Sequence, residues 1–232
     1  MRYRVLVVGW ALVWSGLLLF GYVGWQLFVT DLLNASQQAE ATGALRTEFS
    51  RPAPEPEVIE PDDEEPPGEE EPEPMEYFPE ERVETGEAFA FLTIPSIGLE
   101  GVVVYEGVDR ETLKKGPGHM GRTPVPGQPG NAVISGHRTT YGRPFFDFDL
   151  LEVGDTVEME TATGTHVYEV REIEVVEPTD VWVTDPRDGA WLTMTTCEPK
   201  FSARQRLVIW AEMVAGPNFD YVQSQGLEAV SP

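Results

Sequence analysis

The stretch that decides the fold is residues 191–211, WLTMTTCEPKFSARQRLVIWA, which predicts a strand, a polar loop and a second strand. The first strand is rich in β-branched and aromatic residues, and the run LVIW is typical of a buried strand. If the two strands are neighbours, Cys197 and Arg206 face each other at one end of a sheet. A thiol beside a guanidinium favours the thiolate, and a histidine from elsewhere would complete a Cys/His nucleophile pair.

The same stretch carries a family resemblance. The run TMTTC at residues 193–197, with an arginine nine residues after the cysteine, resembles the signature TLxTC…R of sortases. Met194 stands where that family usually has leucine, a change that conserves side-chain volume. Sortases are membrane-anchored cysteine transpeptidases of Gram-positive bacteria.

The resemblance extends over residues 88–214 and is greatest to the class E sortases of high-GC Gram-positive bacteria. The motifs that carry it include IPSIG at residues 94–98, GPGH at 116–119, PGQPGN at 126–131 and GHR at 136–138. It implies a catalytic group of Cys197, His137 and Arg206. We predict no cofactor and no metal ligands, and the sequence leaves a dependence on calcium open.

An all-β fold is predicted for the C-terminal part of the chain. Short apolar segments are separated there by turns rich in glycine and proline, and Asp109 can cap a short helix that runs to Lys115. The expected strands are residues 89–94, 102–105, 131–135, 156–161 and 165–176, followed by the two strands of the opening stretch. This pattern predicts a closed barrel or a sandwich, and the resemblance implies a closed barrel of about eight strands with one or two short helices.

Three segments are expected along the chain. Residues 1–30 are the cytoplasmic tip and the membrane anchor, residues 31–87 a linker, and residues 88–232 the catalytic domain, whose core begins near Ala88.

The anchor is predicted from an uncharged apolar run at residues 5–30, which exceeds the roughly 20 residues that span a bilayer. Two arginines precede the run and Asp31 follows it, so the N-terminus is expected in the cytoplasm and the rest outside, with a single span. A cleaved signal peptide is the alternative, and the length of the run disfavours it.

The linker is strongly acidic, because residues 55–81 hold fourteen acidic side chains and no basic one. Like-charge repulsion and frequent prolines predict an unfolded spacer, with cation binding as the alternative. The net charge of −24 excludes nucleic acid as a partner, since phosphate binding needs a basic patch.

Three histidines compete as the partner of Cys197. His166 lies within an apparent amphipathic strand and is expected at the surface, whereas His119 lies in a glycine- and proline-rich loop that could approach the site. His137 directly follows a buried strand and matches the histidine of the resembled family, so it is the predicted base.

The cationic group is ambiguous from the residues alone. Arg204 and Arg206 lie two positions apart and would share a face of a continuous strand. The resemblance assigns the catalytic role to Arg206, with Arg204 and His119 as possible supporting residues. The hydroxyl of Thr196 is a candidate donor to the substrate or to an oxyanion.

The resemblance implies a reaction in which Cys197 cleaves a sorting signal of the LAxTG or LPxTG kind between threonine and glycine. The expected partners are secreted proteins that carry this signal and the amino group of a lipid II-type peptidoglycan precursor. Two alternatives remain: a non-enzymatic, membrane-tethered binding module, and an L,D-transpeptidase. The sixty residues between His137 and Cys197 disfavour the latter, which has a compact SHGC-type motif.

Overall fold

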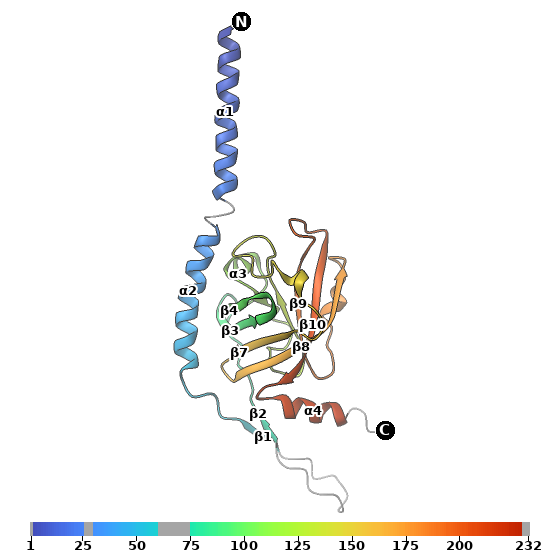
Figure 1. The fold of residues 1–232 in the computed structure, drawn as a ribbon. Helices are drawn as coiled ribbons and strands as arrows, with labels where there is room; N and C mark the ends of the chain where they lie inside the picture. The colour runs from blue at the N-terminus through green and yellow to red at the C-terminus, as the bar shows by residue number, and fades with distance from the viewer. Residues whose placement is uncertain (1, 26–29, 60–74, 229–232) are drawn as a thin grey trace, which may run out of the picture.

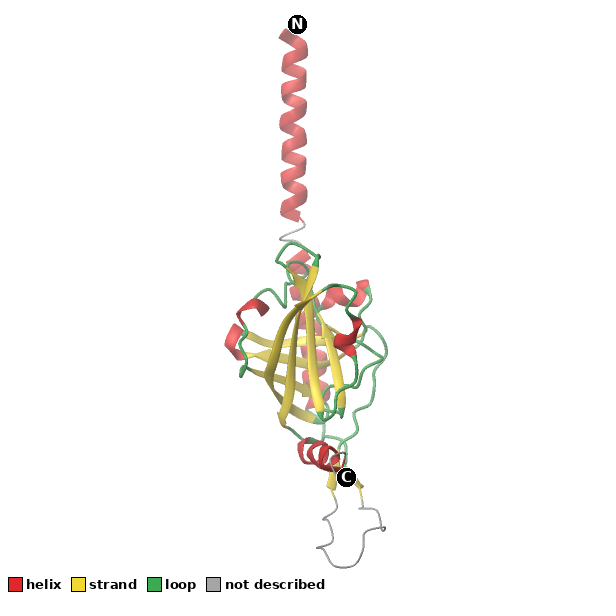
Figure 2. Ribbon diagram, turned by 90° about the vertical axis from the view of Figure 1, so that its right-hand side faces the viewer, coloured by secondary structure: helices red, strands yellow, loops and turns green. Residues whose placement is uncertain are grey.

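The computed structural model describes residues 2–25, 30–59 and 75–228. A closed barrel forms its centre, with the strand order β10-β8-β7-β3-β4-β5-β6-β9 (Figures 1 and 2). The barrel strands are β3 (Ala88–Ile94), β4 (Leu99–Glu106), β5 (Gly118–His119), β6 (Gly130–Ser135), β7 (Thr156–Thr161), β8 (Gly164–Val176), β9 (Ala190–Glu198) and β10 (Gln205–Ala215). The predicted closed barrel of about eight strands is therefore confirmed.

The barrel is closed by antiparallel pairing of β9 with β10, the two strands of the opening stretch. Neighbouring strands are antiparallel except β4 with β5 and β6 with β9, which are parallel. The interior is filled by apolar side chains from all sides, including the fully buried Leu92, Ile134, Leu192 and Ile209. Burial of each such side chain stabilises the fold by about 1.5–3 kcal/mol.

Short helices complete the described part of the domain. They are α3 (Arg110–Lys115), α4 (Phe219–Glu228) and the 3₁₀ turns η2 (Pro95–Ile97), η3 (Phe148–Leu150) and η4 (Val181–Thr184). Asp109 caps α3 as predicted, because its carboxylate accepts hydrogen bonds from the backbone N–H groups of Glu111 and Thr112.

Strand β5 falls in a stretch that the sequence assigns to a glycine- and proline-rich loop. Its two residues pair with β4 on one side and with β6 on the other. A Cβ atom on Gly118 would lie 2.1 Å from the carbonyl oxygen of Gly107, so only glycine allows this approach.

Much of the predicted linker is folded. Residues Thr30–Phe49 form α2, which runs along the outside of the barrel (Figure 1). Leu45 is 2% exposed and packs in a cluster with Phe91, Val103 and Tyr105. The expectation that the core begins near Ala88 is therefore wrong, because an alanine-rich helix with few large apolar side chains gives little sign in sequence that it docks.

Helix α2 also replaces part of a missing strand partner. Strand β5 pairs with β4 only at Tyr105 and Glu106, which leaves the backbone of Val103 unpaired on that side. The side-chain amide of Gln38 accepts from the N–H of Val103 at 2.9 Å and donates to its carbonyl oxygen at 3.2 Å. One side chain of α2 thus provides the hydrogen-bond partners for both backbone polar groups of Val103 at the edge of β4.

The acidic segment is anchored at both ends. Strands β1 (Glu57–Ile59) and β2 (Met75–Tyr77) pair antiparallel beside α4 (Figure 1). The ring of Tyr77 packs on that of Tyr221 in α4, with 4.6 Å between centroids. The predicted unfolded spacer is therefore wrong at its two ends, and residues 60–74 lie outside the described residues. Because both ends meet at one strand pair, this segment does not set the distance between anchor and barrel.

The apolar N-terminal segment forms α1 (Arg2–Gly24). Within the described residues, it is the one helix long and apolar enough to cross a membrane, and an 18-residue window within Tyr3–Gly24 has a mean hydropathy of 2.0. The last part of the predicted span, residues 26–29, lies outside the described residues.

Candidate active site

Cys197 and His137 are delivered to one end of the barrel by neighbouring parallel strands. Ser135 in β6 is in register with Thr195 in β9, and the backbone N–H of Gly136 donates to the carbonyl oxygen of Thr195 at 3.1 Å. His137 and Cys197 each follow two positions later, and both are half-buried. Pairing of two strands sixty residues apart therefore brings the predicted nucleophile and base to the same end of the barrel.

Side chains also join the ends of these two strands. The hydroxyl groups of Ser135 and Thr195 lie 2.9 Å apart, and the hydroxyl of Thr196 donates to the carbonyl oxygen of Gly136 at 2.8 Å. Thr196 is buried, and its one hydroxyl proton is already used in this bond. The structure thus makes Thr196 a brace between β9 and the segment that carries His137, rather than the free donor that the sequence suggests.

Arg206 is the register partner of Cys197 across the antiparallel β9–β10 pair. Its guanidinium Nη1 donates to the carbonyl oxygens of Ala203 at 3.1 Å and Gln205 at 2.9 Å. Arg204 precedes β10, which begins at Gln205, and is exposed in the loop. The two arginines therefore do not belong to one continuous strand, and only Arg206 is held beside the cysteine.

Arg138 is a residue of this site whose role the sequence does not indicate, although it lies in the GHR motif. It is 2% exposed, and its guanidinium donates to the carbonyl oxygen of Cys197 at 3.2 Å. It also pairs with the carboxylates of Glu198 and Asp149, so its buried charge is neutralised from two sides. Because Arg138 directly follows His137, its hydrogen bond connects the segment that carries His137 to the backbone of Cys197.

The imidazole of His137 lies in a partly desolvated position. Burial lowers its pKa below the ordinary value of 6.5, because the charged form loses hydration. The neutral imidazole therefore predominates at neutral pH. Its ring packs against that of Tyr141, with 5.1 Å between the centroids.

The other two histidines serve the interior of the barrel. His119 in β5 is fully buried, with Nδ1 2.7 Å from a carboxylate oxygen of Glu106 and Nε2 2.8 Å from the carbonyl oxygen of Pro124. Both ring nitrogens are occupied, so His119 is not a second base for Cys197 in this conformation.

The surface position expected for His166 is wrong. His166 is 0% exposed, and its Nε2 lies 3.2 Å from the hydroxyl of Thr163. His166, Tyr168 and Val170 are the buried residues at this end of β8, so the face that carries the polar groups of His166 and Tyr168 points into the barrel. Burial lowers the pKa of His166 to about 4.

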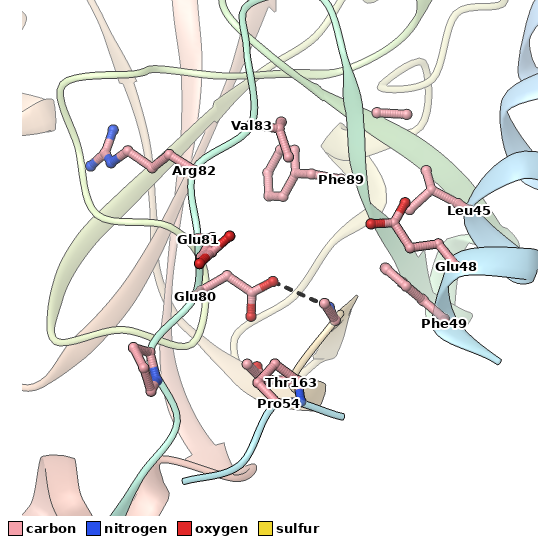
Figure 3. Close-up of a pocket in the computed structure, with 13 residues that line it drawn as sticks. Leu45, Glu48, Phe49, Pro54, Glu80, Glu81, Arg82, Val83, Phe89 and Thr163 are labelled. Atoms are coloured by element: carbon pink, nitrogen blue, oxygen red, sulfur yellow. Dashed lines mark hydrogen bonds between the residues drawn. The ribbon is translucent and has the colours of Figure 1, made fainter. Parts of the chain in front are cut away.

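A cavity of about 430 Å³ lies elsewhere, between the end of α2, residues 79–83 and the β7–β8 turn (Figure 3). Glu80 borders it and accepts a hydrogen bond from the N–H of Ala162 at 3.2 Å. The turn is at the Gly164 end of β8, whereas Val176 at the other end pairs with Arg206. This cavity is therefore at the opposite end of the barrel from Cys197.

Metal chemistry finds no support among the described side chains. Within residues 2–25, 30–59 and 75–228, no group of three histidine, cysteine, aspartate or glutamate residues could hold a metal ion.

A closed barrel with a cysteine, a histidine and an arginine at one end has the residues of a cysteine-dependent acyl-transfer site. The family model described as "Sortase domain" matches residues 92–214, more than half of the chain. The chain therefore belongs to the sortase family.

Relatives that are similar to this chain over most of the barrel include class E sortases, which supports the predicted class. Sortase SrtE1 of Streptomyces coelicolor is 29% identical over 223 residues, which cover 89% of this chain and 56% of that protein. The solved structure of sortase E from Streptomyces avermitilis is 38% identical, with a TM-score of 0.53, and the match covers 65% of this chain and 97% of that one. A Clostridium perfringens sortase D5 transpeptidase is 32% identical, with a TM-score of 0.54 and coverage of 58% and 83%. The chain thus spans little more than half the length of SrtE1.

Proposed function

We propose that this chain is a cysteine transpeptidase that cleaves a C-terminal sorting signal between threonine and glycine. The acyl group then passes to an amino group of the cell wall precursor. The observation that carries the proposal is the register at one end of the barrel. Parallel pairing of β6 with β9 extends to Ser135 and Thr195, two residues before His137 and Cys197, and antiparallel pairing of β9 with β10 makes Cys197 and Arg206 register partners.

The proposed reaction has two acyl-transfer steps. The neutral imidazole of His137 takes the proton of the Cys197 thiol as the sulfur attacks the threonine carbonyl. His137 then gives that proton to the glycine amine as the carbon–nitrogen bond breaks. The resulting thioester is attacked by the incoming amine, whose proton returns to His137 as the thiolate leaves. The new amide bond completes the transfer.

Arg206 would stabilise the negative charge that develops on the carbonyl oxygen, or bind the substrate backbone. A guanidinium is permanently charged and offers donors in a rigid fork. Thr196 and Arg138 would act indirectly, because their hydrogen bonds hold the segments that carry His137 and Cys197.

We further propose that α1 anchors the enzyme, with its N-terminus in the cytoplasm and the barrel outside the cell membrane. The arginines before the apolar segment and Asp31 after it support this orientation. Protease added to intact protoplasts should then digest the barrel, and protection of the barrel would contradict the orientation.

The activity is tested with peptides that contain LAxTG and LPxTG, each incubated with the protein and an amine acceptor. The expected result is release of the glycine fragment and an amide product. Cys197→Ala should abolish both, and His137→Ala should remove most activity while folding is retained. Equal losses on His119→Ala and His137→Ala would refute the choice of histidine.

The competing function is a membrane-tethered binding module without catalysis. A methanethiosulfonate reagent separates the two, because a catalytic Cys197 should be modified rapidly in the folded protein. A Cys197 that is inert in the folded chain, together with no cleavage of either peptide, would favour the binding module.

A further inference from the structure

The start of α2 contacts the loop that follows His137. One carboxylate oxygen of Asp31 accepts a hydrogen bond from the backbone N–H of Gly142 at 3.0 Å. The other carboxylate oxygen lies 3.5 Å from Nε of Arg143. The Asp31 side chain is 28% exposed and that of Arg143 is 51% exposed, so this contact lies at the surface of the barrel. The helix nearest to the anchor is thus joined to the segment that carries the proposed base.

The loop needs such support, because its backbone is held in an unfavourable conformation. Tyr141, Gly142 and Arg143 have φ angles of +53°, +77° and +50°, three consecutive residues in the left-handed region. Side chains other than glycine adopt this region at a cost, so the surrounding contacts must hold it in place. The hydrogen bond from Gly142 to Asp31 lies in the middle of this strained turn.

A second residue of α2 fits against the same turn. A Cβ atom on Gly142 would lie 2.2 Å from Oδ1 of Asn34. The Nδ2 group of Asn34 donates to the carbonyl oxygens of Lys114 and Lys115, at 2.9 and 2.8 Å, at the end of α3. Asn34 is buried and fixed by these bonds, so it forms a rigid surface on which the turn rests.

The turn is coupled to the imidazole through Tyr141. The Tyr141 ring packs against the His137 ring, and the N–H of Phe145 closes the loop by donating to the carbonyl oxygen of His137 at 3.2 Å. A shift of the turn would therefore move Tyr141 and alter the orientation of the imidazole. Proton transfer depends on that orientation within hydrogen-bonding reach.

We propose that Asp31 is a positioning residue for His137 and acts through Gly142 and Tyr141, with Asn34 as its support. The start of α2, which contains Asp31 and Asn34, is then part of the catalytic apparatus. This inference rests on the proposed function of His137 as the proton donor and acceptor.

The test compares Asp31→Ala with Arg46→Ala in the full chain reconstituted in detergent. Arg46 is a matched control, because it is also an α2 side chain that forms an ion pair with the barrel, at 2.6 Å from Glu160. Arg46 is in the last turn of α2 and therefore lies far from the His137 loop. Asp31→Ala should lower kcat on the preferred peptide by about fivefold or more, as expected for one lost hydrogen bond to a charged group, with KM within about twofold. Arg46→Ala should leave kcat close to that of the unchanged chain.

Asp31→Asn provides the rescue, because its side-chain oxygen can still accept from Gly142. It should recover most of the kcat that Asp31→Ala loses. Equal kcat in Asp31→Ala and Arg46→Ala, or no recovery in Asp31→Asn, would overturn the positioning role.

A readout independent of activity separates this inference from the proposed function. The Tyr141 ring shifts the NMR signals of the His137 imidazole, and Asp31→Ala should move those signals while Arg46→Ala leaves them in place. Unchanged signals in Asp31→Ala would overturn the coupling. Absence of peptide cleavage by the unchanged chain would refute the proposed function but leave the NMR result valid as evidence on the coupling.

Discussion

Arg206 and Arg204 are two residues apart, yet different structures hold them. Arg206 is in β10 opposite Cys197 and donates to two backbone carbonyl oxygens, whereas Arg204 is exposed in the preceding loop. Arg206→Lys should therefore lower turnover by about tenfold or more, because lysine lacks the rigid fork of donors and one lost transition-state hydrogen bond costs about 1.4 kcal/mol. Steady-state kinetics with the preferred peptide measures this loss.

Arg204→Lys is the matched control and should change turnover little. Circular dichroism must show that both variants are folded, because an unfolded barrel would imitate a catalytic defect. Small and equal effects of the two substitutions in folded protein would contradict the role of Arg206.

His166 makes stability depend on pH. The pKa of His166 is about 4 in the folded barrel and near 6.5 in the unfolded chain. Between these two pH values the unfolded chain binds a proton at His166 and the folded chain does not. The free energy of unfolding is therefore unaffected by protonation of His166 above about pH 6.5. It decreases as the pH falls from 6.5 toward 4, by up to about 1.4 kcal/mol per pH unit. Urea unfolding at a series of pH values should show this slope.

The substitution His166→Gln isolates the contribution of this one histidine. The decrease in stability between pH 6.5 and 4 should be smaller in the variant than in the unchanged chain. The same pH slope in both proteins would show that other groups cause the dependence.

Among the elements, β1 and β2 pair with each other and so hold the two ends of the acidic segment together. Deletion of residues 60–74, with a short glycine-rich turn between β1 and β2, should leave peptide cleavage and the melting temperature almost unchanged, because no described contact is removed. Kinetics and thermal unfolding test this expectation.

Deletion of residues 57–81 is the contrasting variant. It also removes Tyr77, which packs on α4, and Glu80, whose carboxylate accepts hydrogen bonds from Thr161 and Ala162 at 3.0 and 3.2 Å. This variant should unfold at a lower temperature. Equal melting temperatures of the two deletions would show that β2 and the residues after it contribute nothing to stability.

At the scale of the whole molecule, the folded unit begins with α2. A chain that starts at residue 30 should be soluble and stable, whereas one that starts at residue 52 exposes the cluster of Phe91, Val103 and Tyr105 that Leu45 covers. Loss of that burial, about 2 kcal/mol or more, should lower the melting temperature by roughly 4–8 °C. Differential scanning calorimetry of the two chains checks this, and equal melting temperatures would contradict a docked α2.

The arrangement also places the proposed catalytic end toward the anchor. Asp31 follows the end of α1 by seven residues and contacts the loop after His137, while β1, β2 and α4 lie at the far end of the barrel (Figure 1). Seven residues span at most about 25 Å, so the site would lie close to the membrane surface if α1 is the anchor. A precursor held in that membrane would then be within reach.

Features that depend on neighbouring residues could be predicted from the sequence alone. Cys197 and Arg206 belong to two strands joined by a short loop, so local spacing was enough to predict that they face each other, and their register confirms it. The alternating strands and the cap of α3 are local in the same sense. The long apolar run at the N-terminus is likewise evident from composition alone.

Tertiary structure decided what depends on packing between distant segments. His137 reaches the end of the barrel that carries Cys197 because β6 pairs in parallel with β9 across sixty residues, and a position after a buried strand does not by itself show which strand lies beside it. The inward face of β8 was decided by the barrel interior, because a strand with polar and apolar residues on both faces has no preferred side in isolation. The docking of α2 and the anchoring of the acidic segment depend on single side chains that meet a surface formed only after the barrel has closed.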